Sequence, residues 1–337
     1  MQLWRRVFTR KAWLSLFLGL FLLASTVVTW SALAQTGRTV KKVAFLSSSD
    51  VELKKITGVE EGLVKYGYRQ GENVEFTCAN AEGSSARLRE YAVRIVEQHP
   101  DVIVTTGDDE TVAVKKAMGS RRIPLVFVGA TDLLYNGMIH DMNHPGGDMT
   151  GIDGRTVLLS GKRLEYFKRL LPGVRDVMVL YDPAEESSLK SLPYLREVAH
   201  KLDVRVNPIG VTSAQAAVAE LKKIDPGKGQ GAMVLCSLLF SSLSAEIKPV
   251  LYAREIPLMG AGEVKGLDGM LASYGMPYLE QGEQASRLVA KVLAGENPSH
   301  IPVESPAQVE LIVNTQIAHR FGLTLSPSGL ALASQFK

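Results

Sequence analysis

The chain has 337 residues, of which 46% are hydrophobic and 22% are charged, as in ordinary folded proteins. This length predicts about two domains, and the composition excludes a disordered, collagen-like or coiled-coil chain. The formal charge of +3 comes from four basic residues among the first 34, because without them it falls to −1. Residues 35–337 therefore lack the excess of basic side chains that nucleic-acid binding requires.

The first 34 residues have the order of a secretory signal peptide: a basic segment ending at Lys11, an apolar stretch over 12–30, and then Ser31-Ala32-Leu33-Ala34. We expect export to the periplasm, cleavage after Ala34 and a short linker over 35–42. A retained membrane anchor is the alternative, because the apolar stretch is close to the ~20 residues that span a bilayer. The Ala-x-Ala ending favours cleavage.

The chain has two cysteines, Cys78 and Cys236, which exclude a disulfide-dense scaffold and a multi-cysteine metal site. Each ends an apolar strand pattern in a different half of the chain. We therefore predict two separate buried thiols rather than a bridge.

Short β-branched runs alternate with amphipathic stretches along the first half of the body. The pattern predicts strands at 43–46, 74–78, 102–104 and 125–128, with helices between them. A glycine-rich loop over 135–153 ends in a short strand at 150–152. Such alternation is typical of parallel βαβ units with helices on both faces of a sheet.

The same rhythm restarts in the second half. Strands are expected at 177–181, 204–206, 232–236, 257–259 and 269–273, again separated by helices. A last helix over 278–293 and a strand at 309–313 are too short a tail to fold alone. We predict an α/β protein of two lobes, with a ligand cleft where the carboxyl ends of the strands face each other.

No P-loop, dinucleotide-binding glycine loop or nucleophile elbow is found in the body. Among the scattered histidines, His140 and His144 have an i, i+4 spacing but lie in a loop, so no metal site is expected. The acids Asp109 and Glu110 are interpreted as residues that favour a helix N-terminus through the helix dipole.

Small hydroxyl residues, glycines and acids follow most of the predicted strands. Such loops leave backbone N–H groups free for a ligand carboxylate, and an acid from the other lobe can hold an ammonium group. A zwitterion such as an amino acid fits this polarity, although helix capping alone explains some of these residues. The strand-end candidates are Ser47, Ser48, Thr106, Gly107, Thr131, Asp132, Asp182, Ser237 and Glu263.

Several segments in a fixed order resemble the ABC transporter substrate-binding proteins of the tryptophan/tyrosine type. They are GVEEGL at 58–63, YGYRQGENV at 66–74, IPLVF at 123–127, PGGDMTG at 145–151, LYDPAEESS at 180–188 and AGENPSHIPVE at 294–304. The chain departs from the family pattern at Leu133, at Ser187, over 236–239 and at the acidic pair Asp108-Asp109.

The resemblance implies a type I periplasmic binding protein fold, with two Rossmann-like lobes joined by three crossovers that close on a ligand by hinge motion. It implies lobes of 43–152 plus about 276–302, and of 153–275 plus about 303–337. It also implies aromatic amino acids as ligands, with pocket residues Ser47, Thr106, Thr131, Asp132, Glu185 and Ser188.

From these features we expect a monomeric, exported solute-binding protein of an ABC importer. It would bind a small polar organic molecule in the interlobe cleft and deliver it to a permease in the inner membrane. No catalytic set, cofactor, metal or nucleic-acid partner is expected. The alternatives are a periplasmic ligand sensor that regulates a membrane receptor and, less favoured by the residues, an enzyme on the same two lobes.

Overall fold

The computed structural model describes residues 40–131, 133–134, 137–235, 237, 244–261 and 269–336. The predicted signal peptide and most of the linker lie outside the described residues. Residues 41–337 form one compact unit. Within the described ranges, no helix is long and apolar enough to cross a bilayer.

Two sheets organise this unit. The first sheet has the strand order β2-β1-β3-β4-β5, and all of its strands are parallel. Its strands and the helices between them are β1 (Lys41–Ser47), α2 (Leu53–Val64), β2 (Val74–Asn80), α3 (Ser85–Glu97), β3 (Val102–Thr105), α4 (Asp108–Met118), β4 (Leu125–Ala130) and β5 (Met149–Asp153).

The second sheet has the order β12-β11-β10-β9-β8-β6-β7 and is parallel except where β10 meets β11. Its elements are α5 (Thr156–Leu170), β6 (Asp176–Tyr181), α6 (Glu186–Lys201), β7 (Arg205–Gly210), α7 (Ala214–Leu221), β8 (Gln230–Val234), α9 (Ser244–Arg254), β9 (Leu258–Ala261), β10 (Ala272–Gly275), β11 (Glu310–Val313), α11 (Thr315–Arg320), α12 (Pro327–Leu330) and β12 (Gln335–Phe336).

The chain passes between the two sheets three times. It leaves the first sheet after β5 and returns to it after β10 as helix α10 (Tyr278–Leu293), which packs against α2. Glu304 then forms a parallel bridge with Ile152 of β5 before the chain enters β11. Both sheets therefore contain segments that are distant in the sequence.

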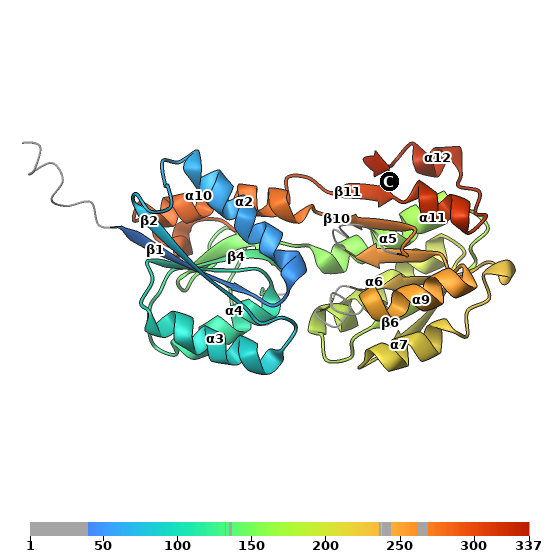
Figure 1. Cartoon of the computed structure of the whole chain (residues 1–337), viewed down its shortest axis with the longest axis horizontal. Helices are drawn as coiled ribbons and strands as arrows, with labels where there is room; N and C mark the ends of the chain where they lie inside the picture. Colours follow the sequence, from blue (N-terminus) through green and yellow to red (C-terminus); the bar gives the residue numbers. More distant parts are fainter. Residues whose placement is uncertain are drawn as a thin grey trace, which may run out of the picture. The chain divides into compact units, whose positions relative to one another are not determined.

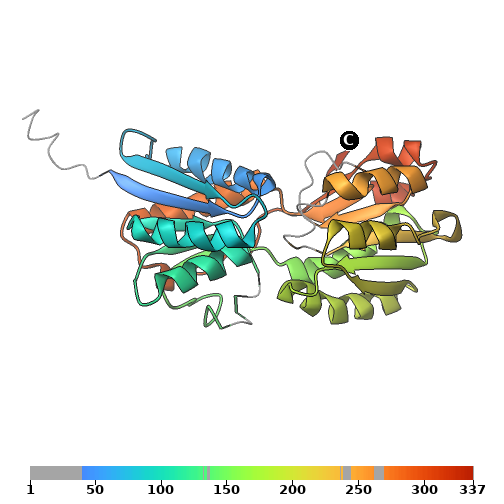
Figure 2. The ribbon, with the colours of Figure 1, turned by 60° about the horizontal axis from the view of Figure 1, so that its bottom comes forward.

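Alternating apolar side chains explain why helices cover both faces of the first sheet. On β1, Val43 and Phe45 pack with residues of α2 and α10, while Ala44 and Leu46 pack with residues of α3 and α4. Figures 1 and 2 show the two helix pairs on opposite faces of this sheet. A strand buried on both faces reads as a continuous hydrophobic run, which is how β1 was recognisable in the sequence.

Helices α2 and α10 approach closely because glycines stand at their contact. A Cβ atom at Gly58 would collide with the carbonyl oxygen of Leu279, and one at Gly282 would collide with the carbonyl oxygen of Lys55. Gly62 faces Ser286 in the same contact. The approach fixes the position of the first turns of α10 relative to α2.

The strands and helices predicted from the sequence are present, with small differences in their ends. Ser84 caps α3 and Ser213 caps α7, each accepting a hydrogen bond from a backbone N–H. The antiparallel pairing of β11 and the additional strand β12 were not predicted.

The prediction for Cys78 is wrong. Its side chain is exposed, because β2 is the edge strand of the first sheet and lacks a neighbour on one side. Partial burial, and then the carboxylate of Glu60, raise the pKa of the thiol. Cys236 lies outside the described residues.

Gly282→Ala is expected to destabilise the protein by about 1–3 kcal/mol, because the added methyl group forces the backbones of α10 and α2 apart. Gly173→Ala is the matched control, since nothing lies near a Cβ atom at that loop position. Urea denaturation of both variants measures the difference. Equal stability of the two variants would show that the helices separate without cost.

Candidate functional site

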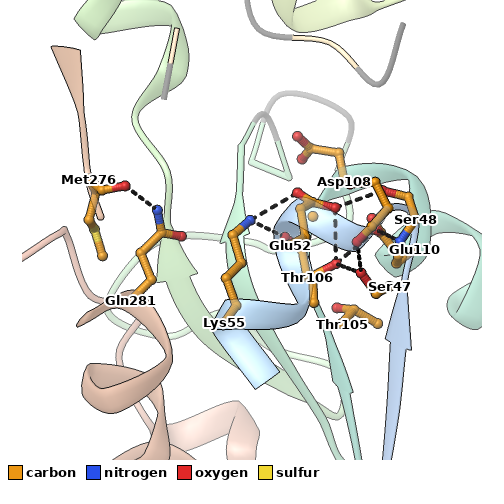
Figure 3. Close-up of polar contacts among 12 residues, drawn as sticks. Ser47, Ser48, Glu52, Lys55, Thr105, Thr106, Asp108, Glu110, Met276 and Gln281 are labelled. Carbon is orange, nitrogen blue, oxygen red and sulfur yellow. Dashed lines mark hydrogen bonds and ion pairs between the residues drawn. The ribbon is translucent and has the colours of Figure 1, made fainter. Parts of the chain in front are cut away.

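A pocket opens at the carboxyl ends of β1, β3 and β4, the end of a parallel sheet where ligands bind. The first sheet and α10 contribute one wall, which includes Ser48, Gly107 and Gln281. Residues beyond the first crossover, among them Arg163 and Glu185, contribute the other. Polar side chains of the first wall are shown in Figure 3.

A buried ion pair lies at the floor of this pocket. Lys55 is in the first turn of α2, and its Nζ lies 3.1 Å from Oε1 of Glu52. The same ammonium donates a hydrogen bond to the carbonyl oxygen of Thr106 and lies 4.7 Å from the ring centre of Tyr278. Only 5% of the Lys55 side chain and 16% of the Glu52 side chain are exposed.

The pair decides the ionisation of Glu52. Burial by itself would raise the pKa of this carboxyl. The charge of Lys55 and hydrogen bonds from Ser48 and Lys55 outweigh burial and hold the pKa of Glu52 below its usual value. Glu52 is therefore a carboxylate at neutral pH.

A second buried carboxyl, Glu110, stands beside Glu52. It belongs to the first turn of α4, and its Oε1 accepts hydrogen bonds from the backbone N–H of Ser48 (2.6 Å) and from Oγ1 of Thr106 (2.9 Å). Burial, and then the charge of Glu52, raise the pKa of Glu110 to about 8. Two adjacent carboxyls cannot both ionise at low cost, so at neutral pH Glu110 keeps its proton.

This geometry corrects the interpretation of Glu110 as a helix-dipole residue. The side chain is 1% exposed and belongs to a hydrogen-bonded cluster that joins β1, α2, β3 and α4. Asp109, by contrast, is exposed on the pocket wall. Partial desolvation, and then the carboxylates of Glu52 and Asp182, raise the pKa of Asp109.

The predicted site residues at the strand ends of the first sheet fall into two layers. Ser48 and Gly107 line the pocket, whereas Ser47 and Thr106 are fully buried beneath it. Thr131 instead lines a separate, mainly apolar pocket, and its buried Oγ1 has no hydrogen-bond partner in the described part of the chain. Asp132 lies outside the described residues.

Free backbone N–H groups were predicted at these strand ends, and for two of them the prediction is wrong. The N–H of Ser48 donates to Glu110, and the N–H of Thr131 donates to Oδ1 of Asp108 over 2.6 Å. The chain supplies its own carboxyl groups where a ligand carboxylate was expected.

Among the residues beyond the first crossover, Glu185 and Ser237 lie on the pocket wall. Asp182 accepts a hydrogen bond from the backbone N–H of Ala184 and contributes to the potential around Asp109. Ser188 is buried within α6. Glu263 lies outside the described residues.

Among the pocket residues that were not predicted from the sequence are Glu52, Lys55, Arg163, Tyr278 and Gln281. A signal was present for two of them. Lys55 and Gln281 each stand on an otherwise apolar helix face, Lys55 four residues before Val59 and Gln281 four before Ala285. A charged or amide group on such a face needs a buried partner.

Gln281 is only partly satisfied. Its Nε2 donates to the carbonyl oxygen of Met276 over 3.1 Å, while its buried Oε1 has no hydrogen-bond partner among the residues that the structure describes. This oxygen lies over Gly129, where a Cβ atom would collide with it and would lie 3.1 Å from Nζ of Lys55. Gly129 therefore keeps this corner of the pocket open.

Charged carboxyls, an amide oxygen and hydroxyls are the polar groups that this pocket offers. Within the described ranges, no three His, Cys, Asp or Glu side chains are grouped so that they could hold a metal ion. The pocket lining described here includes no histidine or cysteine that could act as a base or nucleophile.

We expect the free energy of unfolding to fall as the pH rises from about 5 to about 8. Native Glu110 holds its proton up to a pKa of about 8, whereas the unfolded chain releases it near 4.5, so raising the pH favours the unfolded state. The lowered pKa of Glu52 acts at more acidic pH, outside this window. Urea denaturation at several pH values measures the slope.

Glu110→Gln should remove most of this slope, because the amide resembles the protonated carboxyl. Glu90→Gln, at an exposed position on α3, should leave the slope unchanged. A Glu110→Gln protein with an unchanged slope would assign the pH dependence to other groups.

Lys55→Met is expected to destabilise the protein by about 3–5 kcal/mol, because it leaves the Glu52 carboxylate buried without its counter-ion. Lys201→Met removes one partner of an exposed pair with Glu197 and should leave the midpoint of denaturation unchanged. Similar midpoints for the two variants would contradict the structural role given to Lys55.

Comparison with known proteins agrees with this architecture. The family model described as "ABC transporter substrate binding protein" matches residues 41–337. A tyrosine-binding protein of Clostridioides difficile is 25% identical over 268 residues, which cover 78% of this chain and 76% of the relative.

Two solved structures share the fold. A conserved domain protein from Vibrio cholerae has a TM-score of 0.80 and 25% identity, covering 89% of this chain and 100% of that one. A Streptococcus pneumoniae ABC domain in complex with L-Trp has a TM-score of 0.79 and 21% identity, with the same coverage. The two parallel-sheet α/β domains thus have the type I periplasmic binding protein architecture. With nearly the whole described body matched by the family model, the chain belongs to the ABC transporter substrate-binding protein family.

Proposed function

We propose that this protein is exported to the periplasm and delivers a small polar organic ligand with an amino group to an ABC permease in the inner membrane. The observation that carries the proposal is the pocket at the strand ends, which residues of both domains line. Family membership and the leader sequence support it. An amino acid is the ligand suggested by the tyrosine-binding relative and the structure with L-Trp.

We infer that the two domains act as hinged lobes, made of 43–152 plus about 276–302 and of 153–275 plus about 303–337. The three passages of the chain between the sheets support these boundaries. A ligand that contacts both walls favours the closed arrangement by its differential affinity. A monomer is sufficient for this mechanism, since one chain supplies both walls of the pocket.

The proposed ligand contacts are residues on the pocket wall. From the predicted set these are Ser48, Gly107, Glu185 and Ser237, to which the structure adds Asp109 and Gln281. Thr106 and Ser47 support them from below through hydrogen bonds within the chain.

The protein, expressed with its own leader and purified, is expected to begin at Gln35 in intact-mass analysis and to bind a small polar metabolite in calorimetry. Glu185→Gln should weaken that binding at least about tenfold, because the charge on the second wall is lost. Its neighbour Glu186, exposed and paired with Lys190, provides the control variant Glu186→Gln.

The outcomes are distinct. A protein that retains residues 1–34 would instead be anchored. If no compound of a broad panel of amino acids, amines, sugars and organic acids binds at millimolar concentration, the transport function is rejected. Equal affinity in the Glu185 and Glu186 variants would remove Glu185 from the site.

A further inference from the structure

The charges around the pocket are unbalanced. Among the described residues that line it, five are acids, namely Glu52, Asp108, Asp109, Glu110 and Glu185. The bases are Lys55 and Arg163. Even with Glu110 protonated, the described lining keeps an acidic excess.

Both bases are engaged by the protein itself. The Lys55 ammonium is surrounded by Glu52, the Thr106 carbonyl and the Tyr278 ring. Arg163 is 2% exposed and donates from Nε to the carbonyl oxygen of Tyr274 (2.8 Å) and from Nη1 to that of Thr156 (3.3 Å). The ammonium is thus held by groups of the chain itself, and the guanidinium is almost wholly buried.

The neutral donors of Ser48 are also occupied. Its N–H is bound by Glu110, and its Oγ donates to Glu52 over 2.7 Å. A ligand carboxylate would have to displace these groups and then lie against the Glu52 carboxylate. Two carboxylates in contact repel each other strongly where water is excluded.

The unsatisfied groups of the pocket instead require a donor. Oε1 of Gln281 is a carbonyl-type acceptor on a side chain that is 5% exposed, without a partner within the described chain. Figure 3 shows it pointing toward the side of the pocket that holds Lys55 and Glu52. Asp109, exposed on the wall, has no ion pair among the described residues and is repelled by Glu52 and Asp182. A cation that carries N–H groups would donate a hydrogen bond to Gln281 Oε1 and would reduce the repulsion around the Asp109 carboxylate.

We propose that the ligand binds as an organic cation: its ammonium donates to Gln281 Oε1 and balances the carboxylates of Asp109 and Glu52, and no carboxylate subsite exists at Ser48. This inference rests on the proposed function and narrows it. Among ligands with an amino group it selects amines over zwitterionic amino acids.

Two series of probes, each with an amine, a zwitterion and an anion, test the inference by calorimetry. The first is tyramine, L-tyrosine and 4-hydroxyphenylacetate; the second is putrescine, 4-aminobutyrate and succinate. In at least one series we expect the amine to bind at least tenfold more tightly than the zwitterion, and the anion not to bind. An amino acid that binds as tightly as its amine, or tighter, overturns the inference while leaving the binding function intact. Binding by no amine of either series also overturns it. The proposed function itself is rejected only if no compound of the broad panel binds either.

Two variants connect the preference to the residues. Asp109→Asn and Gln281→Met should each weaken binding of the preferred amine about tenfold or more, with denaturation midpoints close to that of the unmodified protein. Asp203→Asn, in the turn before β7 and outside the pocket, is the control and should bind the amine unchanged. If both pocket variants bind as the control does, the cation is not held there and the inference is wrong.

Discussion

The buried ammonium of Lys55 is the constraint around which this pocket is arranged. A charge that is almost excluded from water must be paired, and its partners Glu52, Thr106 and Tyr278 come from three separate parts of the chain. The glycine contact between α2 and α10 brings Tyr278 to Lys55 and Glu52, and the pairing of β1 with β3 places Thr106 beside them. The same close approach places Gln281, one turn beyond Tyr278, on the pocket wall.

The ion pair in turn decides the state of the surrounding acids. Burial, and then the Glu52 carboxylate that Lys55 keeps ionised, raise the pKa of Glu110, so Glu110 retains its proton and accepts hydrogen bonds from Ser48 and Thr106. The backbone N–H of Ser48, which was expected to hold an anion, is thereby used within the protein. The pocket is left with carboxylates and an amide oxygen, and its chemistry changes from that of an anion site toward that of a cation site.

The fold was largely predictable because its signals are local. Runs such as Val43–Leu46 and Val102–Val104 are apolar on both faces, and helices between them show a 3.6-residue period. The strand ends also gave three pocket residues, Ser48, Gly107 and Ser237, and the family resemblance gave Glu185. The exposure of Cys78 was not predictable, since an edge strand and an inner strand have similar sequences and only strand order distinguishes them.

The sequence by itself determined the alternation of strands and helices, the two-domain α/β class and the edge of the sheets where a ligand would bind. These follow from periodicity and turn chemistry, which act over a few residues. Only the tertiary structure decided the sign of the charge in the pocket. Lys55, Glu110 and Gln281 are far apart in the chain, and whether a carboxyl is charged depends on which distant groups remove its water and supply its counter-ion.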